Sequence, residues 1–170
     1  MHEHVVGIGV SPVLSKRIKL QINDEDFDPY VETYWTLLDL LRDELGFTGT
    51  KKGCNEGACG TCTVLLNDLA IKSCLLYAVQ ADGQKVLTIE GLESAGELHP
   101  LQKAFIEHDG LQCGFCTPGQ IIASKALLDR NPNPTEDDVK RALAGNLCRC
   151  GCYNKIVESV LAAARALGKT

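Results

Sequence analysis

The stretch GCNEGACGTC, residues 53–62, places Cys54, Cys59 and Cys62 in a glycine-rich loop, and Cys74 follows downstream. The spacing C-x4-C-x2-C with a distant fourth cysteine is typical of plant-type [2Fe–2S] sites. Four thiolates must converge on two irons, and the glycines let the backbone curl and aim N–H groups at sulfur. Buried apolar cysteines are a poorer interpretation, because the loop is polar. We therefore predict a [2Fe–2S] site on these four cysteines.

The segments around this loop predict a small domain of strands with one helix, residues 17–92. Residues 17–22 alternate like a half-buried strand, and residues 36–45 carry a helical leucine stripe that Gly46 ends. The segment TVLLNDLAIKSC reads as a hairpin that turns at Asn67-Asp68. A further strand is expected in residues 85–92, with Cys74 arriving from the end of the hairpin.

The second half of the chain, residues 93–170, is predicted to be helical, after a polar linker near residues 91–97. Four segments have helical spacing with capping residues: 97–110, 117–131, 134–145 and 153–168. Short connections favour a four-helix bundle. Each of two helical hairpins then presents a cysteine pair at its bend, CGFC in the first and CRC in the second.

This second cysteine set consists of Cys113, Cys116, Cys148 and Cys150. C-x2-C with C-x-C brings four thiolates from two bends, and this spacing alone fits either structural zinc or an iron–sulfur cluster. Cys116 precedes a helix N-terminus, where the dipole favours the thiolate. A Rieske centre needs histidine ligands at suitable spacing. No histidine of the chain meets that need, and His99 and His108 are interpreted as surface residues of the first helix of this half.

Composition narrows the class of protein. The chain has 170 residues, 45% of them hydrophobic, nine cysteines and a net charge of −5. This charge argues against nucleic acid and anionic membrane surfaces as partners, and no apolar run is long enough to span a bilayer. The N-terminus lacks the layout of a secretory signal, so we expect a cytoplasmic location. In a reducing compartment, cysteines are metal ligands or redox groups more often than disulfides.

Three motifs in one order, GCNEGACGTC, LQCGFCTPG and GNLCRC, carry a resemblance. Together they resemble the small iron–sulfur subunit of xanthine oxidase-family molybdenum hydroxylases, whose relatives include the small subunits of bacterial carbon monoxide dehydrogenase and 4-hydroxybenzoyl-CoA reductase. The resemblance covers residues 17–167 and leaves residues 1–16 as an N-terminal extension. It implies an α+β protein, with a plant-ferredoxin-like β-grasp domain followed by an all-α four-helix-bundle [2Fe–2S] domain.

The resemblance also implies cofactors and partners. It implies two [2Fe–2S] clusters, one on each cysteine set, and so favours iron over zinc in the second. It implies molybdopterin on a large subunit, with FAD on a medium subunit, in a heterotrimer or its dimer. Gln112 matches the family glutamine that contacts the pterin, and Cys150 matches the ligand that also hydrogen-bonds it.

The sequence departs from the family pattern directly after CRC. Cys152 lies in Gly151-Cys152-Tyr153, where relatives often have a threonine. We favour the interpretation that Cys152 is a small buried residue, similar in size to that threonine. One alternative is that Cys150 and Cys152 form the C-x-C pair and displace Cys148. Another is a spare thiol that oxidises, or replaces a ligand when the cluster is damaged.

The resulting hypothesis is an electron-transfer subunit that links molybdopterin to FAD on other chains. We identify no catalytic residue on this chain, and the segment GIGVSP lacks the third glycine of a dinucleotide-binding loop. A free-standing ferredoxin-like carrier explains the first cysteine set but not the second domain. A thiol-based or zinc-binding, redox-sensing interaction protein is the remaining alternative. Metal analysis and colour distinguish it, because a zinc protein is colourless.

Overall fold

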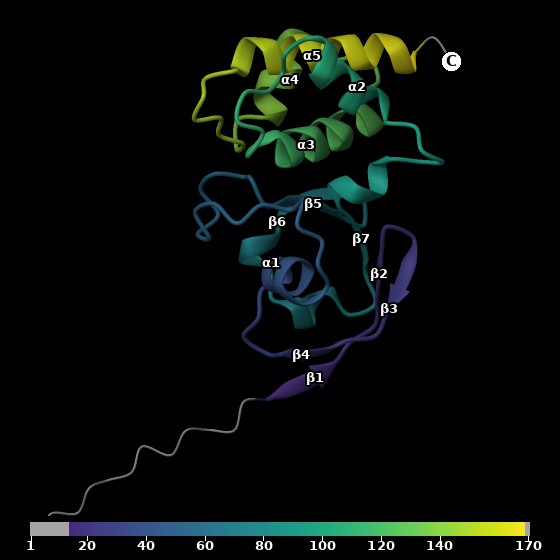
Figure 1. Ribbon diagram of the computed structural model, residues 1–170, viewed down its shortest axis with the longest axis vertical. Helices are drawn as coiled ribbons and strands as arrows, with labels where there is room; N and C mark the ends of the chain where they lie inside the picture. Colours follow the sequence, from purple (N-terminus) through teal and green to yellow (C-terminus); the bar gives the residue numbers. More distant parts are fainter. Residues whose placement is uncertain (1–13, 169–170) are drawn as a thin grey trace, which may run out of the picture.

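The computed structural model describes residues 14–168. The four helices of the second half lie above the sheet in Figure 1, and the helix of the first half lies below it. The predicted extension, residues 1–16, lies almost wholly outside the described residues, and so does GIGVSP. The last two residues of the extension, Ser15 and Lys16, belong to the first strand. Among residues 14–168, none of the helices combines the length and apolar character that a bilayer crossing requires.

Seven short strands lie in the first half of the described chain. Their bounds are β1 Ser15–Arg17, β2 Leu20–Ile22, β3 Glu25–Phe27, β4 Tyr30–Glu32, β5 Thr63–Leu66, β6 Leu69–Lys72 and β7 Lys85–Leu87. Five of them form one sheet in the order β3-β2-β7-β5-β6, and β1 pairs separately with β4. The β2–β7 pair is parallel, and the other pairs are antiparallel.

Two predicted strands differ from the observed ones. Residues 17–22 divide between β1 and β2, because the chain changes partner from β4 to β3 and β7 at this point. The predicted alternation still holds, since Ile18, Leu20 and Ile22 are all buried. The strand expected over residues 85–92 ends at Leu87, and a 3-10 turn over Ile89–Leu92 follows.

One face of the sheet is covered by the predicted leucine helix. It begins with α1, Leu37–Asp39, and continues as a π-helical turn over Leu40–Glu44. Thr36 caps it by accepting a hydrogen bond from the Asp39 N–H. Its buried leucines pack against β2 and β5 in one apolar cluster with Val31 and Ala78. The hairpin turn lies at Asn67-Asp68 as predicted, with both residues at positive φ.

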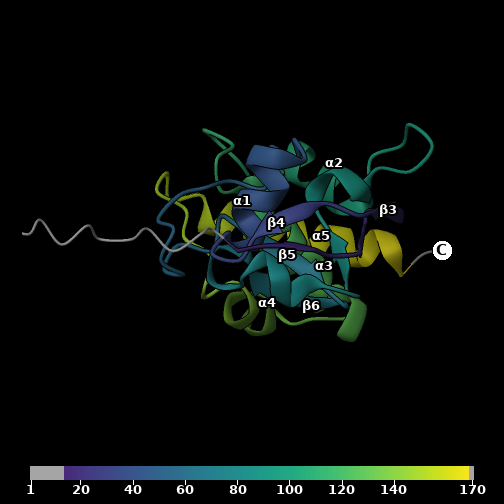
Figure 2. The ribbon, with the colours of Figure 1, turned by 90° about the horizontal axis from the view of Figure 1, so that it is seen from below.

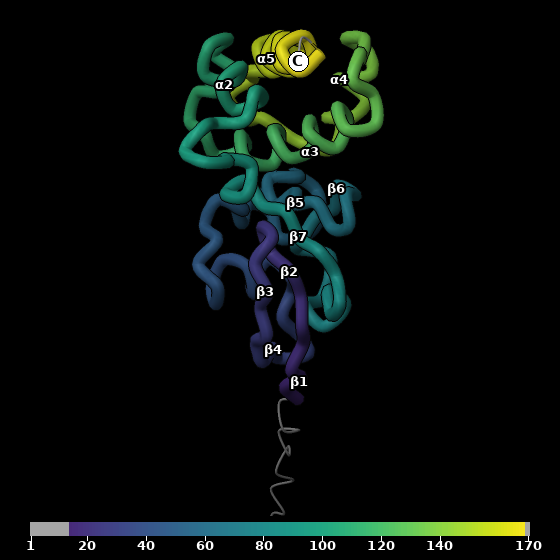
Figure 3. Tube along the Cα trace, turned by 90° about the vertical axis from the view of Figure 1, so that its right-hand side faces the viewer, coloured from purple at the N-terminus to yellow at the C-terminus, as the bar shows by residue number. Residues whose placement is uncertain are grey.

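Four helices form the upper layer of the described chain: α2 Pro100–Glu107, α3 Thr117–Arg130, α4 Glu136–Ala142 and α5 Tyr153–Leu167. They surround one apolar core that includes Phe105, Ile122 and Ile156. Figure 3 shows α5 end-on between α2 and α4, with α3 beneath them. Helix α3 packs on β5 and β6, and in the view from below it overlaps β5 (Figure 2). The two cysteine-bearing regions therefore meet where α3 lies on the sheet.

Candidate metal centres

The first predicted site is a loop rich in N–H donors to sulfur. The Cys54 Sγ accepts hydrogen bonds from the N–H of Cys59 at 3.3 Å and of Glu56 at 3.5 Å. The Cys59 Sγ in turn accepts the Cys54 N–H at 3.5 Å, and the Thr61 hydroxyl lies 3.3 Å from it. The N–H groups of Glu56 and Cys59 lower the pKa of Cys54 to about 7. This side of the loop is suited to stabilising negative charge on sulfur.

The other two cysteines of the first site are buried away from solvent. Cys62 and Cys74 are 2% and 6% exposed and pack against Leu38 of α1. Burial, followed by the hydrogen bond with Cys62, raises the pKa of Cys74 to about 11. Cys74 lies in a 3-10 turn over Ser73–Leu75 directly after β6. The Ser73 hydroxyl and N–H both donate to the Cys62 carbonyl, at 2.8 and 3.3 Å, and hold the two cysteines together.

Gly53, the first residue of this loop, passes close to two of the loop's side chains. A Cβ at that position would lie 2.7 Å from the Thr61 Oγ1 and 3.0 Å from the Cys59 Sγ. The backbone therefore passes close beside the sulfur of Cys59, a predicted ligand, which only glycine permits. The four thiols, the N–H donors and this close approach fit the group that the spacing predicts.

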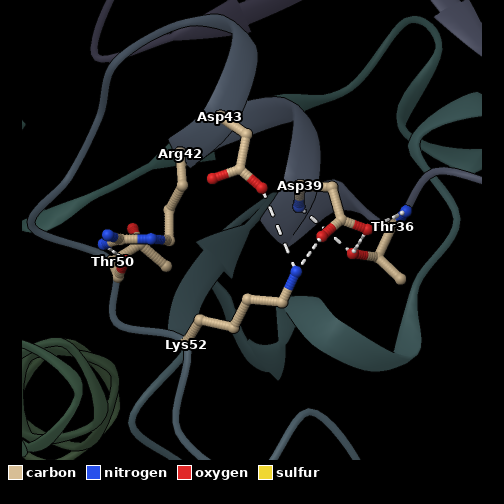
Figure 4. A network of polar contacts seen from close by, with 6 residues as sticks. All are labelled: Thr36, Asp39, Arg42, Asp43, Thr50 and Lys52. Carbon is tan, nitrogen blue, oxygen red and sulfur yellow. Dashed lines mark hydrogen bonds and ion pairs between the residues drawn. The ribbon is translucent and has the colours of Figure 1, made fainter.

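The segment that leads into the loop is clamped to α1 and its π-helical turn. Arg42 donates to the carbonyl oxygens of Thr48 and Thr50, both at 2.6 Å. Lys52 pairs with Asp39 at 2.6 Å. Figure 4 shows this pair and the contact of Arg42 with Thr50. Burial raises the pKa of Asp39, but hydrogen bonds from Lys52 and Thr36 outweigh it, so the net shift is downward. These charges fix the chain just before Cys54.

The second set of cysteines comes together from two loops, as predicted. Cys113 and Cys116 precede α3, whereas Cys148 and Cys150 precede α5. Their side chains pair across the loops, Cys113 with Cys150 and Cys116 with Cys148. Each loop therefore gives one thiol to each pair, and a two-iron cluster needs two thiolates per iron. No three His, Cys, Asp or Glu side chains among residues 14–168 form a group that could hold a single metal ion.

The two pairs differ in burial. Burial and the hydrogen bond with Cys148 raise the pKa of Cys116 to about 12. Burial also raises the pKa of Cys148, but the Cys152 N–H and the Cys116 thiol more than offset this effect. The Cys113–Cys150 pair is the more accessible one, with Cys113 exposed and Cys150 half-buried. Gln112, beside this pair, is also exposed.

Cys152 lies next to Cys148, at the N-cap of α5. It is 6% exposed and belongs to the apolar cluster of this layer. Burial is the main cause that raises the pKa of Cys152, followed by the charge of Cys148. Its contacts are those of a small core residue that also directs its N–H at a neighbouring sulfur.

Both cysteine sets open into one cavity of about 560 Å³. Cys54 and Cys59 line it from the first site, and Cys113, Cys116 and Cys148 from the second. A direct hydrogen bond also connects the two loops, since the Leu147 N–H donates to the Cys59 carbonyl at 2.8 Å. Leu147 directly precedes Cys148. The hydrogen bond therefore connects the backbone of one predicted ligand, Cys59, to the residue next to another, Cys148. Sequence reasoning did not find this contact.

Two known families match the chain. Residues 22–88 match the family described as "2Fe-2S iron-sulfur cluster binding domain", and residues 88–161 match "[2Fe-2S] binding domain". The nicotinate dehydrogenase small FeS subunit of Eubacterium barkeri is 46% identical over 143 residues, which are 84% of this chain and 91% of that one. The chain belongs to the small iron–sulfur subunits of xanthine oxidase-family molybdenum hydroxylases.

Further relatives support this membership of the small iron–sulfur subunits. The nicotine 6-hydroxylase small subunit of Paenarthrobacter nicotinovorans is 46% identical over 158 residues, covering 93% of this chain and 95% of that one. Among solved structures, quinoline 2-oxidoreductase from Pseudomonas putida 86 superposes with a TM-score of 0.88 and 42% identity, covering 91% of this chain and 97% of that one. The aldehyde oxidoreductase of Desulfovibrio gigas gives 0.87 and 40%, covering 91% of this chain but 18% of that longer one. This small iron–sulfur subunit is thus part of an oxidoreductase, with a ferredoxin-like domain and a helical domain.

Proposed function

We propose that this small iron–sulfur subunit holds two [2Fe–2S] clusters and relays electrons between molybdopterin on a large partner chain and FAD on another. When bound, the clusters supply one-electron carriers. The chain itself holds them, insulates them and tunes them. Cys54, Cys59, Cys62 and Cys74 would ligate one cluster, and Cys113, Cys116, Cys148 and Cys150 the other.

The observation that carries this proposal is the direct contact between the two ligand loops. The bond from the Leu147 N–H to the Cys59 carbonyl is 2.8 Å long, and both loops line the same cavity. Two proposed redox sites whose loops share a backbone hydrogen bond are arranged for electron exchange. A free-standing carrier with one cluster would need no such contact.

The choice of Cys148 over Cys152 follows from the pairing of the thiols. Cys148 shares a hydrogen bond with Cys116 across the loops, whereas the thiol of Cys152 shares one with Cys148 of its own loop. A ligand must face the opposite loop to share an iron with it. We therefore assign Cys148 and Cys150 as ligands and Cys152 as a packed neighbour.

The exposed side of the second site is proposed to meet the chain that holds molybdopterin. Gln112 is exposed beside Cys113, and Cys150 is half-buried. Both can reach a group on another chain. Two relatives have "small" in their names, and a third is named as the beta subunit of a complex, which supports a multi-subunit complex here. The heterotrimer or its dimer, the domain bounds 17–92 and 93–170, and the cytoplasmic location stay predictions.

The test is low-temperature EPR of the reduced protein with an iron, sulfide and molybdenum count on everything that co-purifies. We expect about four irons and four sulfides per chain and two distinct [2Fe–2S] signals. We also expect a large molybdenum-containing chain in the same fraction. Zinc in place of iron, or a single cluster, would overturn the two-cluster assignment. A chain that carries both clusters but purifies alone would favour a free carrier.

A further inference from the structure

A buried polar contact joins the first cysteine loop to the loop that precedes Cys148. The Asn146 side-chain amide donates to the Gly60 carbonyl at 2.9 Å and to the Thr63 Oγ1 at 3.1 Å. Asn146 is 7% exposed and Thr63 is 5% exposed. Gly60 lies between Cys59 and Cys62, and Asn146 lies two residues before Cys148. The contact therefore links residues that neighbour ligands of both sites.

A second layer of contacts holds Asn146 itself. Its main-chain carbonyl accepts a hydrogen bond from the Gln120 side-chain amide at 2.9 Å. Gln120 is fully buried on α3, which begins directly after Cys116. The Gln120 carbonyl in turn accepts the Ser124 hydroxyl at 2.8 Å. The main chain of Asn146 is thus fixed to α3, the helix that follows Cys116. Its side chain meanwhile contacts the loop of the first site.

Glycines bring the two loops within direct backbone contact. Gly60 has a φ of +72°, and a Cβ there would lie 2.4 Å from the Gly145 carbonyl. A Cβ at Gly119 of α3 would lie 2.6 Å from the Gly60 carbonyl. Any larger side chain at either glycine forces backbone apart, because these contacts are to main-chain oxygens.

The covalent connection between the halves is a much weaker constraint. Residues 93–98 are all exposed, and the hairpin-like turn of Ser94 with Glu97 holds them at the surface. The relative position of the two sites is therefore set by the buried contacts and not by this linker.

We infer that Asn146 is a positioning residue that fixes the distance and orientation between the two cluster sites. It acts through a joint formed by Gly60, Thr63, Gly119, Gln120 and Asn146. This inference rests on the proposed function. In that function, the joint maintains the Leu147–Cys59 hydrogen bond between the two ligand loops. Asn146 touches neither set of thiols in this role, and its effect on electron exchange comes from geometry.

The test uses the full chain as purified, with its clusters and any chains that accompany it. Two variants open the joint from opposite sides: Asn146→Ala removes the donor, and Thr63→Val removes the acceptor hydroxyl. Thr63→Ser keeps that hydroxyl, and Asn133→Ala changes an exposed asparagine of the same half. Two readouts follow the joint: hydrogen exchange at the Leu147 amide, and the spin–spin splitting between the two reduced clusters in EPR.

We expect Asn146→Ala and Thr63→Val to speed exchange at Leu147 about tenfold and to alter the splitting, with both clusters retained. Thr63→Ser and Asn133→Ala should match the wild type. The inference is wrong if both opening variants leave exchange and splitting unchanged. If Asn146→Ala fails to fold, Thr63→Val decides alone. A wild type with one cluster contradicts the proposed function instead, and the exchange readout still tests the joint because it needs no cluster.

Discussion

At the scale of single residues, Cys152 shows how closely a proposed ligand and a buried core residue are placed. Cys152 is buried in the helical core, and its N–H points at the sulfur of Cys148. A side chain at this position needs only to be small and to tolerate burial. This requirement is consistent with the threonine that the resemblance places there.

The first prediction concerns Cys152→Ser. We expect both [2Fe–2S] signals to stay unchanged, because the variant keeps the backbone donor and the size of the side chain. The free energy of unfolding should fall by about 1–3 kcal/mol, since a hydroxyl is more costly to bury than a thiol. EPR and urea unfolding measure the two effects. Loss of one signal would make Cys152 a ligand and reverse our assignment at Cys148 or Cys150.

His99 corrects a sequence-based interpretation at the same scale. The sequence indicates a surface residue of the first helix of the second half, but His99 is half-buried and forms the N-cap of α2. Its Nδ1 accepts the Leu101 N–H at 3.2 Å, which requires an unprotonated nitrogen. Burial and the charge of Lys125 lower the pKa of His99, while Asp129 opposes them.

A pH dependence follows from this lowered pKa. The folded protein binds the His99 proton less readily than the unfolded chain, whose histidines titrate near about pH 6.5. The stability that neutral His99 provides is therefore complete above about pH 6.5 and declines as the pH falls toward the folded-state pKa. His99→Asn keeps a capping acceptor that does not titrate. We expect urea midpoints of this variant to change less than those of the wild type between about pH 7.5 and about pH 5.5, the range in which histidines titrate. Equal slopes would contradict the assignment.

At the scale of elements, the π-helical turn after α1 determines how the chain enters the first site. Arg42 lies in this turn and donates to two carbonyls of the segment before Cys54, those of Thr48 and Thr50. Figure 4 shows the second of these contacts. Lys52 pairs with Asp39 on the same helix. The helix thus performs two tasks, because its leucines cover the sheet while its polar side orders the cysteine loop.

We predict that Arg42→Gln loosens this loop. Two hydrogen bonds from a charged donor are lost, so the free energy of unfolding should fall by about 1–3 kcal/mol. Iron should be lost faster from the first cluster than from the second, which EPR resolves during exposure to a chelator. Arg165→Gln, at an exposed position of α5, serves as the matched control and should stay within about 0.5 kcal/mol of the wild type. Equal loss from both clusters would argue against a local clamp.

The elements also show what the sequence can predict. The cysteine spacing, the leucine stripe and the Asn67-Asp68 turn depend on local geometry, and the structure bears out the helix and the turn. The strand expected through Leu92 was wrong beyond Leu87, because the Thr88 N–H bonds to the side chain of the distant Asn23. Asn146 was missed for a related reason, although it lies in the quoted motif GNLCRC. Its partners, Gly60 and Thr63, are remote in sequence, and only the fold brings them together. The ligand roles and the four-helix-bundle packing stay predictions.

At the scale of the whole molecule, the contact between α3 and the sheet determines how the two halves behave together. The linker is exposed at Ala95 and Gly96, both at positive φ, whereas the joint around Asn146 is buried. The halves are therefore held mainly by packing.

A cut in the linker tests this view. With a specific protease site placed at Ala95-Gly96, we expect the cleaved halves to elute together in size-exclusion chromatography and to separate only in denaturant. The same cut in Asn146→Ala should release the halves at a lower urea concentration. Separate peaks without denaturant would show that the linker is essential to the assembly.

The parallel pair of β2 and β7 has a consequence for how the protein is made. Gln21 pairs with Lys85 and Ile22 with Val86, so the centre of the sheet joins segments far apart in the chain. Cys54, Cys59, Cys62 and Cys74 all lie in the interval between them. Such non-local pairing is slow to form, and it cannot begin until β7 has left the ribosome. The four thiols of the first site are therefore all synthesised before their sheet closes, and a nascent chain exposes them to iron donors and oxidants alike until it does.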